Sequence, residues 1–150
     1  MEPASLVIGL GNPLQGPDGF GPAVIDRLRR VSLSERTTLL DAGTDLIGHL
    51  DRLAGFDRAI LVDAVAGGAG TGAVSIVDEA AISQWSVASP DSHAVSAVLA
   101  LGLFRRLYPA ARTTIVLVGL DAPYLDVGGG LADGTIQEGV AAVLRLLAAD

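Results

Sequence analysis

The sequence contains no cysteine and no lysine, and these two absences exclude several kinds of chemistry. Without cysteine there can be no disulfide, no Cys-ligated zinc, no iron–sulfur cluster and no thiol nucleophile. All ten basic residues are Arg, which rules out a Walker-type phosphate loop and Schiff-base chemistry because both need an amine. Any metal ion must therefore be bound through oxygen and nitrogen.

Positive charge and long apolar runs are also scarce. The formal net charge of -7 argues against a nucleic acid, whose binding depends on basic side chains that neutralise phosphates, and favours a cation or a basic segment as partner. The apolar run at 94–104 stops at Arg105 and Arg106, well short of a bilayer span. The first five residues carry no positively charged region. We therefore expect a cytoplasmic protein with no nucleic-acid and no membrane partner.

The chain has the length and apolar content of one domain, so we expect a single domain over residues 1–150. Short β-rich runs alternate with segments of helical period, which predicts an α/β fold of three layers: a twisted, mostly parallel sheet of about five strands with helices on both faces. The expected strands are 6–10, 37–42, 58–65, 113–119 and a short edge strand at 73–77. The expected helices are 19–31, 45–55, 93–108 and 134–149.

Three polar residues fall where such a sheet binds ligands, at the carboxyl ends of strands and the starts of helices. Asp18 follows the first strand and a glycine-rich loop, although it is equally well explained as a helix N-cap. Asp63 ends the apolar run Ala59-Ile60-Leu61-Val62, where a buried carboxylate needs a partner. His93 begins a helix that Ser92 is expected to cap, whereas the other histidine, His49, is expected on the solvated surface.

Two carboxylates and one imidazole from separate loops suit nickel, zinc or a similar divalent ion with coordination positions left open. The same three groups suit acid–base catalysis without a metal equally well. A fourth acid, Asp41, ends the second strand, and we expect it either to support the site or to form a local Asx turn.

Several segments, in this order along the chain, are similar to those of the [NiFe]-hydrogenase maturation endopeptidases. The first is Gly9-Leu10-Gly11-Asn12, and the second is Asp18-Gly19-Phe20-Gly21. They are followed by Asp41-Ala42-Gly43-Thr44, Leu61-Val62-Asp63-Ala64, Ser92-His93 and Val118-Gly119. The similarity spans almost the whole chain, and several ordered motifs are far more specific than any one of them.

The resemblance implies that Asp18, Asp63 and His93 are the catalytic and metal-binding residues. It also implies that Asn12, Asp41, Gly43 and Thr44 support the site or shape its loops. The metal would be the nickel already inserted in the hydrogenase large-subunit precursor, which the protease reads as a recognition signal before it removes a C-terminal extension. We expect an activated water as the nucleophile, since the chain offers no thiol and no evident Ser–His pair.

The sequence departs from the family pattern at two positions. Pro17 stands where members often have a second acid beside Asp18, and Gly70-Thr71-Gly72 stands where Pro-Gly-Thr is common. The glycine-rich loop at 121–134 is expected to be the most flexible stretch and is a candidate to shape a substrate groove.

Three rival interpretations stay open at this point. Peptidyl-tRNA hydrolases also begin with a strand followed by Gly-Leu-Gly-Asn-Pro, but the acidic chain and the segment Asp18–Gly21 argue against that esterase. A nucleotide-binding module is disfavoured because Leu14 breaks the Gly-x-Gly-x-x-Gly spacing and Asp18 would repel a pyrophosphate. A nickel-sensing chaperone that binds the precursor without cutting it is compatible with the sequence.

Overall fold

The computed structural model describes residues 1–14, 16–66, 70–85, 92–122 and 130–149, and the side chains of 66 and 92–96 lie outside that description. Within these ranges, five strands form one sheet in the order β2-β1-β3-β5-β4. Their bounds are β1 Ser5–Leu10, β2 Thr37–Gly43, β3 Arg58–Ala66, β4 Val74–Asp78 and β5 Thr114–Ala122. Only β4 runs antiparallel to its neighbour, so the described sheet is mixed but mostly parallel.

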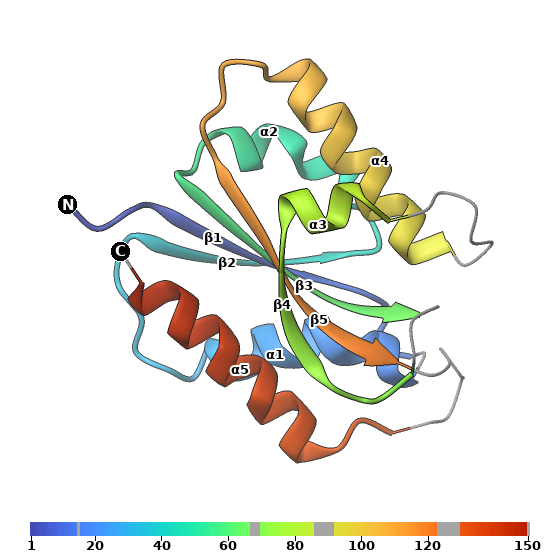
Figure 1. The fold of residues 1–150 in the computed structure, drawn as a ribbon. Coiled ribbons are helices and arrows are strands. Elements are labelled where there is room, and N and C mark those ends of the chain that lie inside the picture. Colours follow the sequence, from blue (N-terminus) through green and yellow to red (C-terminus); the bar gives the residue numbers. More distant parts are fainter. Residues whose placement is uncertain (15, 67–69, 86–91, 123–129, 150) are drawn as a thin grey trace.

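Helices cover both faces of the sheet (Figure 1). The helices α1 (Phe20–Leu28) and α5 (Asp133–Ala148) pack on one face, and α2 (Leu50–Ala54), α3 (Glu79–Ser83) and α4 (Ser92–Leu107) pack on the other. Two 3-10 turns, η1 (Gly16–Gly19) and η2 (Ile47–His49), precede α1 and α2. The expected fold class is therefore confirmed, because the three layers and the mostly parallel sheet are all present.

Strand β3 is covered by helices on both faces, and this explains its continuous apolar run. Ile60 and Val62 belong to the core cluster under α1 and α5, whereas Ala59 and Leu61 belong to the cluster under α2, α3 and α4. A strand points successive side chains to opposite faces, so a strand covered on both sides must be apolar throughout. The same alternation places Asp63 on the face that α4 covers.

The chain changes direction across the sheet at β1. It leaves β1 through α1 to form β2 on one side, and it returns through α2 to form β3 on the other side of β1. At such a switch point the loops after the two strands diverge and leave a crevice at their carboxyl ends, where open α/β sheets bind ligands. Asp18 follows β1 and Asp63 lies near the end of β3, so both acids belong to this edge.

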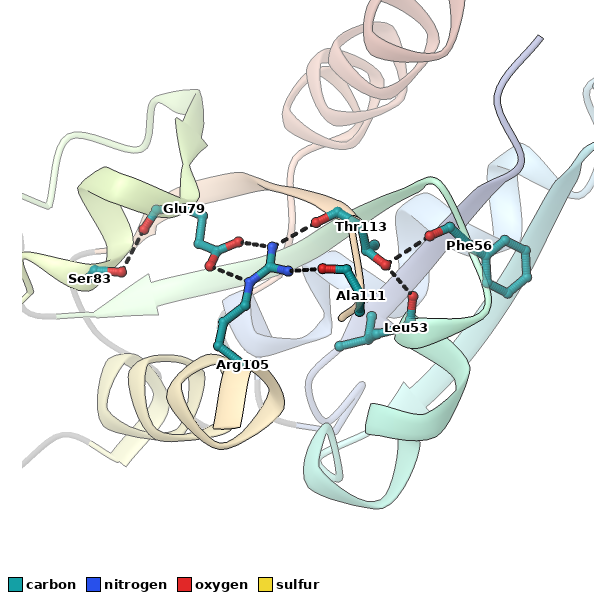
Figure 2. A network of polar contacts seen from close by, with 7 residues as sticks. All are labelled: Leu53, Phe56, Glu79, Ser83, Arg105, Ala111 and Thr113. Atoms are coloured by element: carbon teal, nitrogen blue, oxygen red, sulfur yellow. Dashed lines mark hydrogen bonds and ion pairs between the residues drawn. The ribbon is translucent and has the colours of Figure 1, made fainter. Parts of the chain in front are cut away.

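A partly buried polar network fixes α4 to the rest of this layer (Figure 2). Arg105 of α4 donates from Nε and Nη2 to the two carboxylate oxygens of Glu79 at 2.9 and 2.6 Å, and the ion pair raises the pKa of Arg105. Its guanidinium also donates to the carbonyls of Ala111 and Thr113 at 3.2 and 2.6 Å. Planar forked contacts of this kind fix orientation as well as distance. The helix that begins at Ser92 is therefore firmly anchored near its end.

Some predicted elements differ in detail from the observed ones. The helix expected at 45–55 is shorter than predicted, since only Leu50–Ala54 is α-helical and glycines stand at 48 and 55. His49, expected on the solvated surface, ends η2 and is partly buried. The helix α3 was not expected; the Asp78 side chain caps it by accepting from Ala81 N at 2.8 Å. The predicted start of the loop at 121–134 is also wrong, since β5 extends through Ala122. The rest of the glycine loop, 123–129, lies outside the described residues.

Candidate active site

The loop after β1 approaches Asp18 closely because Gly11 has no side chain. Gly11 has a φ of +129°, and a Cβ there would overlap the carbonyl oxygen of Asp18. Its N–H donates to the carbonyl of Gly43 at 2.8 Å, so the end of β2 supports the loop from the other side. Glycine at this position is therefore required both by the backbone angle and by the packing.

Asp18 is fully buried in η1, immediately before α1. Its Oδ2 accepts a hydrogen bond from the backbone N–H of Asn12 at 2.7 Å. The side chain of Asn12 in turn accepts from Leu14 N at 3.0 Å, which braces the loop between the strand and η1. Asp18 thus does not cap α1, whose N-cap is Gly19 without any side-chain hydrogen bond. The carboxylate is held in place by the loop that it closes.

Asp63 lies in β3, opposite Gly119 of β5, and it is only 7% exposed. Its Oδ1 is buried, and among the described residues no hydrogen-bond partner reaches that atom. Burial raises the pKa of Asp63 well above its ordinary value, and the nearby charge of Asp18 raises it further, whereas the N–H of Ala64 opposes the shift. An acid in this state favours either a proton or a cation beside it.

The two carboxyl groups together offer oxygen donors of the kind that bind a divalent cation. Two buried carboxylates of like charge repel each other unless a proton or a positive ion lies near them. Oxygen donors of this kind bind divalent ions, and the buried Oδ1 of Asp63 is an available donor. Within the described residues no group of three His, Cys, Asp or Glu side chains is arranged to hold a metal. A third protein ligand would therefore have to come from outside that part of the chain.

His93 falls in the first turn of α4, and its side chain lies outside the description. In Figure 1 the first turn of α4 lies at the same end of the molecule as the arrowheads of β3 and β5. Helix α4 also covers the face toward which Asp63 points, by the alternation along β3. The backbone therefore brings the helix of His93 to the sheet edge that carries both acids.

The remaining predicted residues divide into two groups. Asn12 contacts Asp18, and Gly43 holds the Gly11 loop, so both support the carboxylate pair. Asp41 is exposed and accepts from Gly43 N at 3.1 Å, which is the local Asx turn, and Thr44 is exposed at the end of the same turn. Asp41 therefore shapes the loop and does not contact Asp18 in any described interaction.

One polar cluster at this edge was not predicted from the sequence. Asp121, near the end of β5, accepts from Gly70 N at 3.1 Å, from Thr71 N at 3.0 Å and from Thr71 Oγ1 at 2.8 Å. These hydrogen bonds lower the pKa of Asp121. The signal was present in the sequence, because Asp121 is another acid at a strand end, but its partners lie about fifty residues away. The cluster fixes the chain that enters β4.

Comparison with known proteins decides the family. The model of the hydrogenase maturation protease family matches residues 22–148, a range that includes Asp63 and His93 and begins just after Asp18. The chain belongs to this family. The resemblance to the [NiFe]-hydrogenase maturation endopeptidases is therefore confirmed, and this hydrogenase maturation protease is a hydrolase of the peptidase class.

Individual relatives of this hydrogenase maturation protease agree. It is 30% identical over 149 residues to the hydrogenase expression/formation protein HupD of Thiocapsa roseopersicina, in a match covering 97% of this chain and 66% of that protein. It is 29% identical to HupD of Rhizobium leguminosarum bv. viciae, covering 97% of this chain and 74% of the relative. The chain therefore spans about two thirds to three quarters of the length of these relatives.

Solved structures share the fold. An endopeptidase from Escherichia coli superimposes with a TM-score of 0.79 at 25% identity, covering 95% of this chain and 91% of the other. The [NiFe] hydrogenase maturation protease HycI from Thermococcus kodakarensis KOD1 gives a TM-score of 0.75 at 18% identity over 97% of this chain and 91% of the other, a likeness of fold alone.

No helix among the described residues is long and apolar enough to cross a membrane.

Proposed function

We propose that this protease removes a C-terminal extension from the large-subunit precursor of a [NiFe] hydrogenase, and that it recognises the precursor through the nickel ion that the precursor carries. The observation that supports this most strongly is the buried pair of Asp18 and Asp63 at the carboxyl edge of the sheet. The proposed catalytic and metal-binding residues are Asp18, Asp63 and His93. The protein acts as a single domain in the cytoplasm, with neither nucleic acid nor membrane as partner.

In this proposal the nickel ion is part of the substrate, and the protease supplies an incomplete ligand set. Two carboxylates and one imidazole leave coordination positions open, which the precursor fills with its own ligands. A site of this kind binds free metal weakly, which is an advantage, because tight capture of free nickel would destroy the distinction between loaded and empty precursor. The buried Oδ1 of Asp63 and the backbone-held carboxylate of Asp18 provide the two oxygen donors.

The chain's own residues contribute mainly position and charge. Asn12 fixes Asp18 through its backbone N–H, and the pairing of Asp63 with Gly119 of β5 fixes the backbone of Asp63, so neither carboxylate reorganises when the cation arrives. A precursor held through a shared ion has its extension aligned with the protease, which lowers the entropic barrier to attack. The attacking group in this proposal is a water molecule. The proton it loses passes to a carboxylate or to the His93 imidazole.

The test is a cleavage assay on purified nickel-loaded precursor, followed by mass measurement of the large subunit. Asp63→Asn, Asp18→Asn and His93→Ala should each abolish cleavage while Tm stays within a few degrees of wild type or rises. His49→Ala is the matched control, because His49 is the other histidine of the chain, and it should cleave normally. A wild-type protein that binds the precursor and leaves its mass unchanged would instead identify a nickel-sensing chaperone.

A further inference from the structure

An open groove of about 620 Å³ lies beside η1, the turn that holds Asp18. Its wall includes Gly19, the residue that follows the buried Asp18 in η1, and it continues along Pro22 and Asp26 of α1. The lining also includes Leu131, just before α5. Because Gly16 and Gly19 of η1 line the groove, a chain lying in it passes beside the turn that holds Asp18.

The lining of the groove suits an extended polypeptide. Prolines at 13 and 22 and glycines at 16, 19 and 130 keep side-chain bulk low, so another backbone can approach closely. Leu14 at the rim is 80% exposed, although a leucine side chain gains free energy when it is covered. Leu131 also lines the groove and is only partly buried. Two leucines among lining residues of small bulk fit one apolar side chain of an otherwise extended segment.

The charge of the groove restricts the occupant further. Asp26 is the sole ionisable side chain among the described residues that line it. Its described ion pair, to Arg30 at 3.2 Å, joins two side chains that are 61% and 77% exposed, so it is weak. The neighbouring Arg27 is directed elsewhere, to Asp133 and Gln137. Because Asp26 is an acid and the whole chain carries a net charge of -7, the groove attracts a basic side chain and repels an acidic one.

We infer that this groove binds the extended segment of the substrate protein next to its cleavage site, with an apolar side chain against Leu14 and Leu131 and a basic side chain beside Asp26. The inference rests on the proposed function, because it assigns the subsite that holds the polypeptide while the carboxylate pair binds the ion. The groove gives the protease a second recognition element, which binds side chains of the substrate rather than its metal ion. The groove would therefore distinguish precursors that differ in the sequence next to the cleavage site.

The test measures KM and kcat for nickel-loaded precursor with Leu14→Asp and Asp26→Arg. Each variant should raise KM about tenfold or more, equivalent to about 1.4 kcal/mol of binding, and should leave kcat within about twofold, since neither residue touches the reacting atoms. The effect of Asp26→Arg should shrink as salt rises from about 0.05 to about 0.5 M, because charge interactions are screened, whereas that of Leu14→Asp should persist.

Two control variants carry the same chemical changes far from the groove. Leu107→Asp alters another exposed leucine, 59% exposed at the end of α4, and Glu35→Arg reverses an exposed acid before β2. Both should retain the wild-type KM. If wild type cleaves and the groove variants match these controls, the groove inference is wrong while the proposed function stands. If only Leu14→Asp raises KM, the basic side chain is wrong. If wild type does not cleave loaded precursor, the proposed function itself fails and the inference falls with it.

Discussion

The negative charge of Asp18 raises the pKa of Asp63, although the two acids are forty-five positions apart in the sequence. The loop after β1 and the end of β3 bring them together at the switch point of the sheet. Burial contributes the larger part of the shift, so the pair is costly to the fold when both groups are ionised. Such a pair favours either a proton or a cation beside it.

The first prediction concerns pH. A carboxyl group whose pKa is raised in the folded state binds more protons there than in the unfolded chain, so stability falls as pH rises from about 4 through the raised pKa. Asp63→Asn removes that loss. We expect the Tm of the variant to exceed that of wild type at neutral pH and the difference to vanish near pH 4. Thermal melts at both pH values measure it, and a variant less stable than wild type at pH 7 would contradict the assignment.

The second prediction concerns the Asp121 cluster, where the pKa is lowered and the pH dependence of stability is therefore opposite to that of Asp63. Hydrogen bonds from Gly70 and Thr71 lower the pKa of Asp121, so they stabilise the fold above pH 4 and the stabilisation is lost as pH falls through the lowered pKa. Thr71→Val removes the hydroxyl donor and should cost at most about 1 kcal/mol at pH 7, because the pair is exposed. Thr38→Val, at an exposed position on β2, is the control. Urea unfolding at pH 7 and pH 3 should show a larger loss of stability at pH 7 than at pH 3.

Much of the fold could be predicted because both faces of the sheet are covered. The continuous apolar run of β3 leaves little choice but a buried strand, and an acid at its end, Asp63, stands out against that run. The helix α3 escaped prediction because it has five residues, too few to show a helical period. Its one local signal was Asp78, an N-cap residue followed by Glu79.

The site was predictable only in part, for a physical reason. Acids that follow strands can be recognised locally, and Asp18 and Asp63 were proposed as site residues in that way. The partners of Asp121 and the path of the groove depend on contacts between distant segments, and the groove is formed largely by glycine and proline backbone. A groove of this kind is hard to predict from residue patterns, because its shape depends on where side chains are small or absent.

The third prediction concerns Gly21, in the first turn of α1. A Cβ at this position would overlap the carbonyl oxygen of Leu10, at the end of β1, and would lie 2.5 Å from that of Val62, inside β3 next to Asp63. These are backbone atoms, so the helix must move away, and Gly21→Ala should destabilise the fold by about 1–3 kcal/mol.

The control for this substitution is another helical glycine. A Cβ at Gly102 of α4 meets nothing within 4 Å, so Gly102→Ala should be neutral or should stabilise by up to about 1 kcal/mol, because alanine is the better helix former. Chemical unfolding of both variants measures the difference. Equal effects at the two positions would show that α1 does not pack tightly against the strand ends.

The central claim is that the carboxylate pair recognises the substrate by binding a metal ion that the substrate holds. The most direct measurement compares nickel-loaded and nickel-free large-subunit precursor, each incubated with metal-stripped protease, and follows the large-subunit mass over time. We predict that loaded precursor is cut and that the nickel-free form stays intact even when nickel is added to the protease beforehand. Equal cleavage of both forms would contradict the account and would mean that Asp18, Asp63 and His93 work by acid–base chemistry alone.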